Sequence, residues 1–346
     1  MPARSPILGP LLLQGSLHET IWGGQRLATI AGKTLPAGAA IGESWETATE
    51  SVVREGPLAG MRLGQLVDRY EADLIGSRAA EVYGMRFPLL AKFLDANQKL
   101  SVQVHPDDTY AAAHEHGKLG KTETWFILHA EPDAQLVYGL ARPTSAREVR
   151  AAIAANTLEA LLNHIPARAG QVIFVPAGTV HAICGGVALY ELQEYSDVTY
   201  RLYDYGRRQA DGTLRDLHIE QSLDVMRFDT AAPAEVKPLR LELPSSVSGG
   251  EWCALVACRY FLEEELRFAG SISTTTSPAS CVILTVLDGG CALSSSAPTV
   301  ALTRGDTVVL PASLGEYTLT AAGVRLIRSS VPCEDDETAQ RWRREQ

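Results

Sequence analysis

Three features are missing or scarce in this sequence of 346 residues. It contains no apolar run long enough to span a bilayer, and Met1 to Pro6 lack the charged-then-apolar pattern of a signal peptide. Positive charge is in deficit, with 31 Lys and Arg against 41 Asp and Glu and a net charge of -10. These absences argue against membrane and nucleic-acid partners and predict a cytoplasmic protein, in which an anionic ligand would need a local cluster of Lys and Arg.

The six cysteines show no Cys-x-x-Cys spacing, and four of them lie in or beside apolar, strand-like runs. We therefore expect buried free thiols in a reducing compartment. The rest of the composition is that of an ordinary globular protein, with 46% hydrophobic and 21% charged residues. The length is enough for a large core and two domains.

The segment from Lys99 to Asp108 alternates in the way a half-buried strand does. Its apolar residues share one face, and the other face carries Ser101, Gln103 and His105. Gln103 and His105 offer metal-ligand side chains two residues apart, so both can converge on one point. A histidine on a strand is more often structural, so this segment indicates a metal site only together with the segments that follow it.

A second strand is predicted from Lys121 to Leu128, with Glu123, Trp125 and Ile127 on one face. A carboxylate among apolar neighbours is costly to bury unless it is paired, and a metal ion would satisfy it. The alternative is an edge strand that leaves Glu123 in water.

The third segment, from Gly170 to His181, reads Gly-x5-Pro-x-Gly-x2-His and resembles the second sequence motif of the cupin superfamily. The pattern has physical reasons. Gly170 turns the chain into a buried strand, Pro176 ends the pairing because it has no N–H, and Gly178 permits a turn with positive φ. His181 then opens the next strand, directed into a small barrel.

Residues 305–316 form a degraded copy of this motif, with Ser313 in place of the glycine and Glu316 in place of the histidine. Residues 236–304 contain no histidine, so no partner ligand strand is available there. We predict a mainly β fold: a cupin, a jelly-roll-like β-barrel, with a helical insert at about 144–164, followed by a degenerate cupin-like β domain. The expected domains are 1–235, which binds the metal, and 236–346, which lacks a metal site.

The four candidate ligands are Gln103, His105, Glu123 and His181. Two imidazoles and a carboxylate suit zinc, iron or manganese, and the absence of Cys ligands favours a catalytic over a closed structural site. These ligands carry a net charge of about -1, which leaves a divalent ion electrophilic and suited to Lewis-acid chemistry on a carbonyl or hydroxyl.

With these motifs in place, the chain closely resembles the type I phosphomannose isomerases in their short bacterial form. The matching stretches span about residues 8–230 in the family's order, and they are 21–24, 42–46, 92–96, 100–108, 121–125, 175–181 and 196–201. The resemblance implies interconversion of mannose 6-phosphate and fructose 6-phosphate, a small-molecule sugar-phosphate partner, and one zinc ion per chain on the four candidate ligands.

The resemblance also implies roles for residues around the metal. It makes Arg201 and Lys121 catalytic and makes Lys92, Ser101, Lys121 and Arg201 the substrate-binding residues. The chain departs from longer members of the family, which carry a His before the lysine that matches Lys121 and a Pro after it. In this chain Gly120 and Thr122 occupy those two positions, so any role of that His does not carry over.

An aldose–ketose isomerase needs a base near C2 of the sugar and a stabilised enediolate oxygen. The sequence does not decide which group is the base. The candidates are Lys121, a water on the metal, and a carboxylate such as Glu46 or Asp197. Arg201 can instead bind phosphate, or it can be a surface residue paired with Asp197 or Asp204. Two other functions fit the pattern, an iron-dependent cupin oxidoreductase and a non-catalytic sugar-phosphate sensor.

Overall fold

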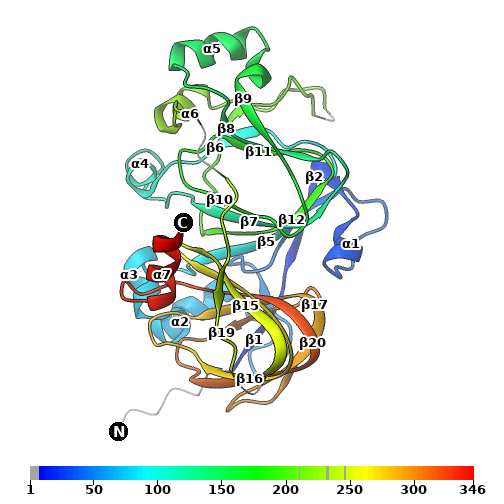
Figure 1. The fold of residues 1–346 in the computed structure, drawn as a ribbon, viewed down its shortest axis with the longest axis vertical. Helices are drawn as coiled ribbons and strands as arrows, with labels where there is room; N and C mark the ends of the chain where they lie inside the picture. The colour runs from blue at the N-terminus through cyan, green and yellow to red at the C-terminus, as the bar shows by residue number, and fades with distance from the viewer. Residues whose placement is uncertain (1–7, 210, 231–233, 245–246) are drawn as a thin grey trace.

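The computed structural model describes residues 8–209, 211–230, 234–244 and 247–346. Its strands form three antiparallel sheets with nine, six and five strands. Figure 1 shows the six- and five-stranded sheets at one end of the molecule and the nine-stranded sheet at the other. The predicted mainly β, cupin-class fold is confirmed, but the sheets are open and do not close into hydrogen-bonded barrels within the described residues.

The six-stranded sheet is the central layer. Its strands, in spatial order, are β10 (Val172–Val175), β7 (Glu123–Ala130), β12 (Val187–Glu194), β5 (Leu89–Ala96), β3 (Ile41–Trp45) and β2 (Ser16–Gly24). Every residue of β5 and β12 is buried, as expected for strands covered on both faces. One face packs Leu94 and Ile127 toward the five-stranded sheet, and the other packs Phe93 and Phe126 toward the nine-stranded sheet.

The five-stranded sheet faces the first of these surfaces. Its strands, in spatial order, are β13 (Tyr200–Tyr203), β6 (Val102–Val104), β11 (His181–Ile183), β8 (Gln135–Leu140) and β9 (Leu162–Pro166). The predicted strand that carries Gln103 is β6, and His181 opens β11 as the motif indicates. The two sheets therefore enclose a shared interior between β6, β7 and β11.

The nine-stranded sheet contains most of the C-terminal residues. Its strands, in spatial order, are β14 (Leu239–Leu241), β15 (Val247–Ala257), β16 (Leu262–Thr275), β20 (Glu316–Ser330), β17 (Val282–Ser294), β19 (Thr307–Leu310), β1 (Leu11–Gln14) and β4 (Val52–Val53), with β18 (Val300–Thr303) beside β17. Two N-terminal strands thus complete a C-terminal sheet, because Leu12 on β1 pairs with Val308 on β19. The division at residue 235 stays a prediction, and residues 231–233 of the expected linker lie outside the described residues.

The two motif copies have the same local shape. Gly170 has φ +89° and leads into β10, and Gly305 has φ +88° and leads into β19. β11 then begins at His181, whereas β20 begins at Glu316, which is exposed. The copy therefore keeps the fold of the motif and presents its terminal carboxylate to solvent.

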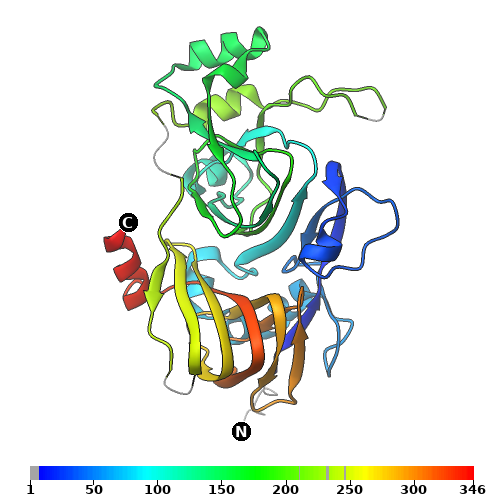
Figure 2. The same cartoon turned by 45° about the vertical axis from the view of Figure 1, so that its right-hand side comes forward.

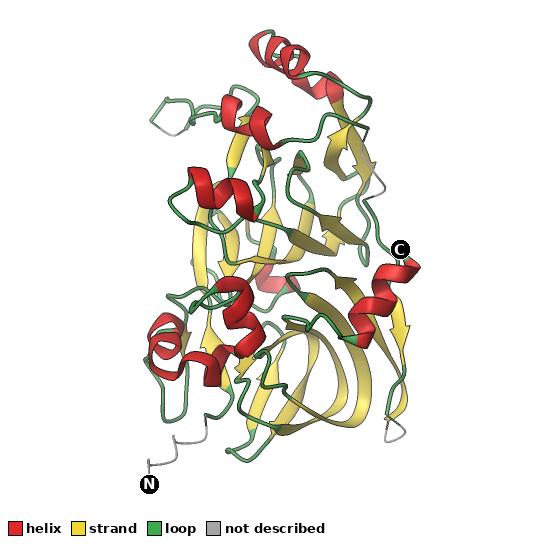
Figure 3. Cartoon of the chain, turned by 90° about the vertical axis from the view of Figure 1, so that its left-hand side faces the viewer, coloured by secondary structure: helices red, strands yellow, loops and turns green. Residues whose placement is uncertain are grey.

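Helices cover the ends and one side of the sheets (Figures 2 and 3). They are α1 (Leu27–Ile30), α2 (Leu63–Ile75), α3 (Ser77–Tyr83), α4 (Asp108–His114), α5 (Ala146–Ala154), α6 (Ile219–Val225) and α7 (Glu337–Glu345), with a 3-10 helix, η1, at Leu158–Leu161. The predicted helical insert corresponds to α5 and η1. None of the helices in the described part of the chain is long and apolar enough to cross a membrane.

Helix α7 differs in one respect from the solvated terminal helix that its charges predict. Trp342 is buried, and its indole N–H donates to Leu255 O on β15 at 2.9 Å, which docks the helix on the sheet. The six cysteines form no disulfides, and Cys281 and Cys291 are buried while the other four are partly exposed.

Candidate metal centre and substrate pocket

One row of residues crosses the five-stranded sheet on the face that is turned toward the six-stranded sheet. Gln103 on β6 lies directly opposite His181 on β11 and opposite Arg201 on β13. Side chains that are directly opposite in antiparallel strands lie on the same face of a sheet. The register therefore places Arg201, Gln103 and His181 on the face that carries the site.

A second row crosses the six-stranded sheet. Trp125 on β7 is opposite Glu191 on β12, which in turn is opposite Lys92 on β5. Glu123 shares the face of Trp125, two residues earlier on β7. A carboxylate at the start of a buried strand and a lysine in the middle of another are thus directed into the space between the two sheets.

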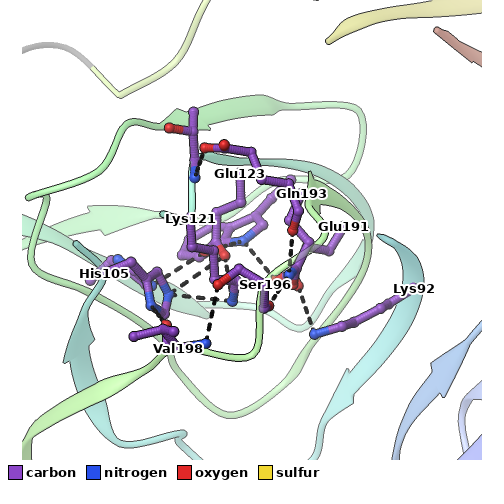
Figure 4. A network of polar contacts seen from close by, with 12 residues as sticks. Lys92, His105, Lys121, Glu123, Glu191, Gln193, Ser196 and Val198 are labelled. Carbon is purple, nitrogen blue, oxygen red and sulfur yellow. Dashed lines mark hydrogen bonds and ion pairs between the residues drawn. The ribbon is translucent and has the colours of Figure 1, made fainter. Parts of the chain in front are cut away.

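His105, Glu123 and His181 come together as a candidate metal site. Figure 4 shows two of them, His105 and Glu123, beside Lys121. Their ligand atoms all lie within 4.8 Å of one another. His181 Nε2 is 3.3 Å from Glu123 Oε1, and His105 Nε2 is 3.6 Å from Glu123 Oε2. All three side chains are at most 1% exposed. Fully buried polar atoms at this spacing are costly unless a partner compensates them.

Hydrogen bonds fix the tautomer and the orientation of the two imidazole rings. His105 Nδ1 lies 3.0 Å from Val198 O, and His181 Nδ1 lies 2.8 Å from Thr179 O. Because a carbonyl only accepts, each Nδ1 carries the proton and each Nε2 offers a lone pair toward Glu123. His181 Nε2 is buried without a hydrogen-bond partner. This donor set fits a divalent cation.

Burial lowers the pKa of both histidines. For His105, the pKa falls well below its ordinary value because of burial and then the positive charge of Lys121. For His181, burial again lowers the pKa and outweighs the opposing effect of Glu123. Both side chains are neutral at neutral pH, which is the form that binds a metal.

Lys121 lies against the same cluster. Its Nζ is 2.8 Å from Glu123 Oε2 and 3.3 Å from His105 Nε2, and the residue is only 5% exposed. The backbone before β7 therefore places an amine in contact with two of the three clustered side chains. A group at this distance is within proton-transfer reach of a substrate held at the cluster.

A cavity of about 220 Å³ opens beside the cluster. It is lined by five of the residues predicted for the site, which are Lys92, Ser101, Gln103, Lys121 and Arg201. Gln103, half-buried, is placed beside His181 by the sheet register, and its role as a fourth ligand stays a prediction. The three clustered residues are fully buried next to the cavity and are not part of its surface.

The sequence reasoning assigned no role to Glu191, which also lines this cavity and holds Lys92. Lys92 Nζ is 3.2 Å from Glu191 Oε1 and 3.7 Å from Glu43 Oε2. Burial alone would lower the pKa of Lys92, but the charges of Glu191 and Glu43 outweigh it and raise that pKa above its ordinary value. A carboxylate within a buried strand was the available signal, the same one that identified Glu123.

Arg201 is not paired with either of the carboxylates proposed for it. Asp197 pairs with Lys118 at 2.8 Å, and Asp204 pairs with Arg215 at 2.6 Å. Arg201 instead donates from Nη1 to Asp216 O at 2.8 Å, and its buried Nε has no hydrogen-bond partner. Burial and then the charge of Arg215 lower the pKa of Arg201, so two guanidinium groups lie close together at the cavity.

Other candidates from the sequence lie away from the cluster. Glu46 pairs with Lys33 at 2.7 Å and is absent from the lining of this cavity. Asp197 lies at the rim, with 68% of its side chain exposed. A Cβ on Gly120 would come within 2.5 Å of the backbone of Asp107 and Asp108, so no larger residue fits before Lys121.

Two facing antiparallel sheets with a His/Glu/His cluster and a cation-lined cavity between them define a cupin with a candidate metal centre. Comparisons with known proteins identify the cupin family that this chain resembles. Residues 11–131 match the family model "Phosphomannose isomerase type I, catalytic domain", and residues 252–331 match "Mannose-6-phosphate isomerase, cupin domain".

Full-length relatives agree with the family models. The mannose-6-phosphate isomerase of Streptococcus mutans is 39% identical over 89% of this chain and 94% of that protein. The isomerase ManA of Bacillus subtilis is 36% identical over 90% of this chain and 95% of that protein. A crystal structure of the mannose 6-phosphate isomerase from Bacillus subtilis superposes with a TM-score of 0.82, at 31% identity, over 93% of this chain and 99% of that one. The chain belongs to the type I phosphomannose isomerase family, as its motifs indicate.

Proposed function

We propose that this aldose–ketose isomerase interconverts mannose 6-phosphate and fructose 6-phosphate, using one zinc ion held by Gln103, His105, Glu123 and His181. One observation carries the proposal: Lys121 contacts the His/Glu cluster directly, while Lys92 and Arg201 line the same cavity. A ligand cluster with a single negative charge and cations around it suits a substrate that has both a carbonyl group and a phosphate group.

The proposed ligands supply a net charge of about -1 and would leave a bound zinc ion electrophilic, so that it would supply Lewis-acid chemistry at a carbonyl or hydroxyl oxygen. The hydrogen bonds from the two Nδ1 atoms to Val198 O and Thr179 O hold the imidazoles in the ligating orientation. Trp125 fixes the carboxylate, because its indole N–H donates to Glu123 Oε1 at 3.1 Å.

Lys121 is our proposal for the residue that moves the proton between C2 and C1. Of the candidates named from the sequence, Glu46 faces away from the cavity toward Lys33, and Asp197 sits exposed at its rim. Lys121 alone among these three is buried against the cluster. In its uncharged form, a buried amine in contact with the site can accept a proton from carbon, and the ammonium group that results can return the proton to the neighbouring carbon.

Arg201 and Lys92 bind the negative charge of the substrate in this proposal. Arg201 keeps a buried N–H without a partner, so it can donate to a phosphate or to an enediolate oxygen. The raised pKa of Lys92 keeps its ammonium group charged throughout the neutral range. Ser101, beside them in the cavity wall, adds a hydroxyl donor.

The deciding experiment is a coupled assay of mannose 6-phosphate conversion with protein that has been stripped of metal by a chelator and reloaded. We expect activity to return with zinc, in proportion to the metal bound. Glucose 6-phosphate serves as the control substrate for the configuration at C2. Restoration by ferrous iron and O2 consumption without isomerisation would favour an oxidoreductase. Binding of both sugar phosphates without turnover would favour a sensor.

A further inference from the structure

The backbone around Lys121 is held by the turn that follows β12. Ser196 Oγ donates to Leu119 O at 2.8 Å, and Glu194 N donates to Thr122 O at 3.1 Å. In return, Thr122 N donates to the Glu194 carboxyl group at 2.7 Å. Three hydrogen bonds from one turn therefore hold the residues on both sides of Lys121.

Asp108 holds the same segment from the other side. Gly120 N donates to Asp108 Oδ1 at 2.9 Å, and Lys121 N donates to Pro106 O at 3.0 Å. The missing side chain at Gly120 is what allows this approach, because a Cβ would collide with the backbone at Asp108. The amides immediately before and after Lys121 thus donate to two different carboxyl groups.

These two carboxyl groups differ in their surroundings. Glu194 is 1% exposed, whereas Asp108 is only partly buried at the start of α4. Burial and the nearby charge of Asp108 raise the pKa of Glu194 well above its ordinary value. The hydrogen bond from Thr122 N compensates one carboxyl oxygen of this buried group.

The C-terminal half of the chain completes the arrangement. Tyr260, in the turn between β15 and β16, donates its hydroxyl to Asp108 Oδ2 at 3.0 Å. Tyr83 lies next to it, with ring centroids 6.5 Å apart, and donates its own hydroxyl to Tyr260 O at 2.8 Å. A continuous set of hydrogen bonds therefore runs from the C-terminal half through Asp108 to the backbone at Lys121.

We propose that Asp108, Glu194 and Tyr260 form a brace that positions Lys121 against the metal cluster. None of the three touches substrate; they act through the amides of Gly120 and Thr122 and so are positioning residues. The C-terminal half is then more than a cap on the catalytic half, because its tyrosine fixes one end of the brace. The proposal rests on the proposed function, in which Lys121 moves the proton.

Two matched pairs of variants test the brace. Tyr260→Phe removes the hydroxyl bound to Asp108, and Tyr83→Phe removes a neighbouring hydroxyl that touches neither carboxyl group. Glu194→Gln keeps an acceptor for Thr122 N, whereas Glu194→Leu removes it. For each variant, four quantities are measured: the metal content, kcat, KM and the hydrogen exchange of the amides at Gly120 and Thr122.

We expect Tyr260→Phe and Glu194→Leu to lower kcat by roughly 10- to 100-fold, since a displacement of about 1 Å costs this much. KM and bound metal should change by less than about twofold, because cation and ligand residues are untouched. Amide exchange at Gly120 and Thr122 should be faster in both. Glu194→Gln should match the parent protein in every measurement. Tyr83→Phe loses a bond to Tyr260 O and none to a carboxyl group, so it should change these quantities far less than Tyr260→Phe does.

Equal kinetics and equal exchange for Tyr260→Phe and Tyr83→Phe would overturn the brace, as would a Glu194→Leu protein with the parent kcat. The exchange measurement separates this proposal from the proposed function. If the parent protein fails to isomerise mannose 6-phosphate but Tyr260→Phe alone of the two tyrosine variants speeds exchange, the brace stands and only the proposed function falls. If exchange is also unchanged, both fall.

Discussion

Lys92 and Glu191 lie directly opposite each other on β5 and β12, and their charged groups are 3.2 Å apart in a position almost closed to solvent. Glu191 Oε2 also accepts from the indole N–H of Trp125 at 3.2 Å, and the same N–H donates to Glu123. One tryptophan therefore connects the carboxylate that holds Lys92, the proposed substrate-binding cation, to the carboxylate that is proposed to hold the metal.

Replacing Glu191 with Gln should weaken both stability and substrate binding. Removing one partner of a buried pair leaves an uncompensated charge on Lys92, so we expect the free energy of unfolding to fall by about 3 kcal/mol. The raised pKa of Lys92 depends on this carboxylate, so KM for mannose 6-phosphate should begin to rise at a lower alkaline pH than in the parent. Urea unfolding and KM across pH measure the two effects. Glu148→Gln, which breaks an exposed pair with Arg142, should change neither by much.

The metal should depend jointly on His105, Glu123 and His181, because each comes from a different strand region and none has a substitute nearby. Changing any one of them to Ala should remove most bound metal and activity together, measured by elemental analysis and the coupled assay. Glu316→Gln changes the equivalent position of the second motif copy, and it should keep one metal per chain and full activity. A His181→Ala protein with full metal content would contradict the site.

Arg201→Ala should keep the metal and lose turnover, since a guanidinium group does not bind a cation but can stabilise negative charge. We expect kcat/KM to fall on the order of 100-fold, the usual cost of losing a charge-stabilising donor. A fall in kcat would assign Arg201 to the transition state, and a rise in KM alone would assign it to phosphate binding. Arg150→Ala, on the exposed face of α5, is the matched arginine control. Unchanged kinetics would remove Arg201 from the site.

Glu263 on β16 should make stability depend on pH. Burial raises its pKa to about 8, and Thr124 only partly opposes this. Between the unfolded value of about 4.5 and the folded value, the native state binds more protons than the unfolded state, so stability falls as pH rises, by at most about 1.4 kcal/mol per unit. Glu263→Gln should remove this slope in urea unfolding from pH 5 to 8. An equal slope in both proteins would show that Glu263 ionises without cost.

Alternation and motif spacing were enough to predict the elements that carry the site. The alternation around Gln103 and the Gly-x5-Pro-x-Gly-x2-His pattern each describe a few neighbouring residues, and local physics decides such segments. The same reasoning identified β7, because a carboxylate in an apolar strand needs a partner. The family resemblance then named Lys92, Lys121 and Arg201, which no local pattern singles out.

Long-range partners were beyond the sequence. Glu191 and Glu194 lie in one buried strand, and only the fold reveals that one faces Lys92 and the other faces Thr122, each many residues away. The position of Glu46 was hidden for the same reason: nothing near it in the sequence indicates that Lys33 and the C-terminal sheet lie on its side. Register across sheets is set by packing, which a single sequence does not display.

The pairing of β1 with β19 has a consequence for how the protein is made. Leu11 emerges from the ribosome early, but its partner Val309 is synthesised about 300 residues later, which takes roughly 15 to 60 s at the usual rates of translation. During that interval β1 has β4 on one edge, but its other edge, where Leu11, Leu12 and Leu13 pair with β19, has no native neighbour. A nascent chain held at this stage should bind chaperones that recognise exposed leucines. Shortening the gap by circular permutation, with β1 placed directly after β19, should reduce that dependence.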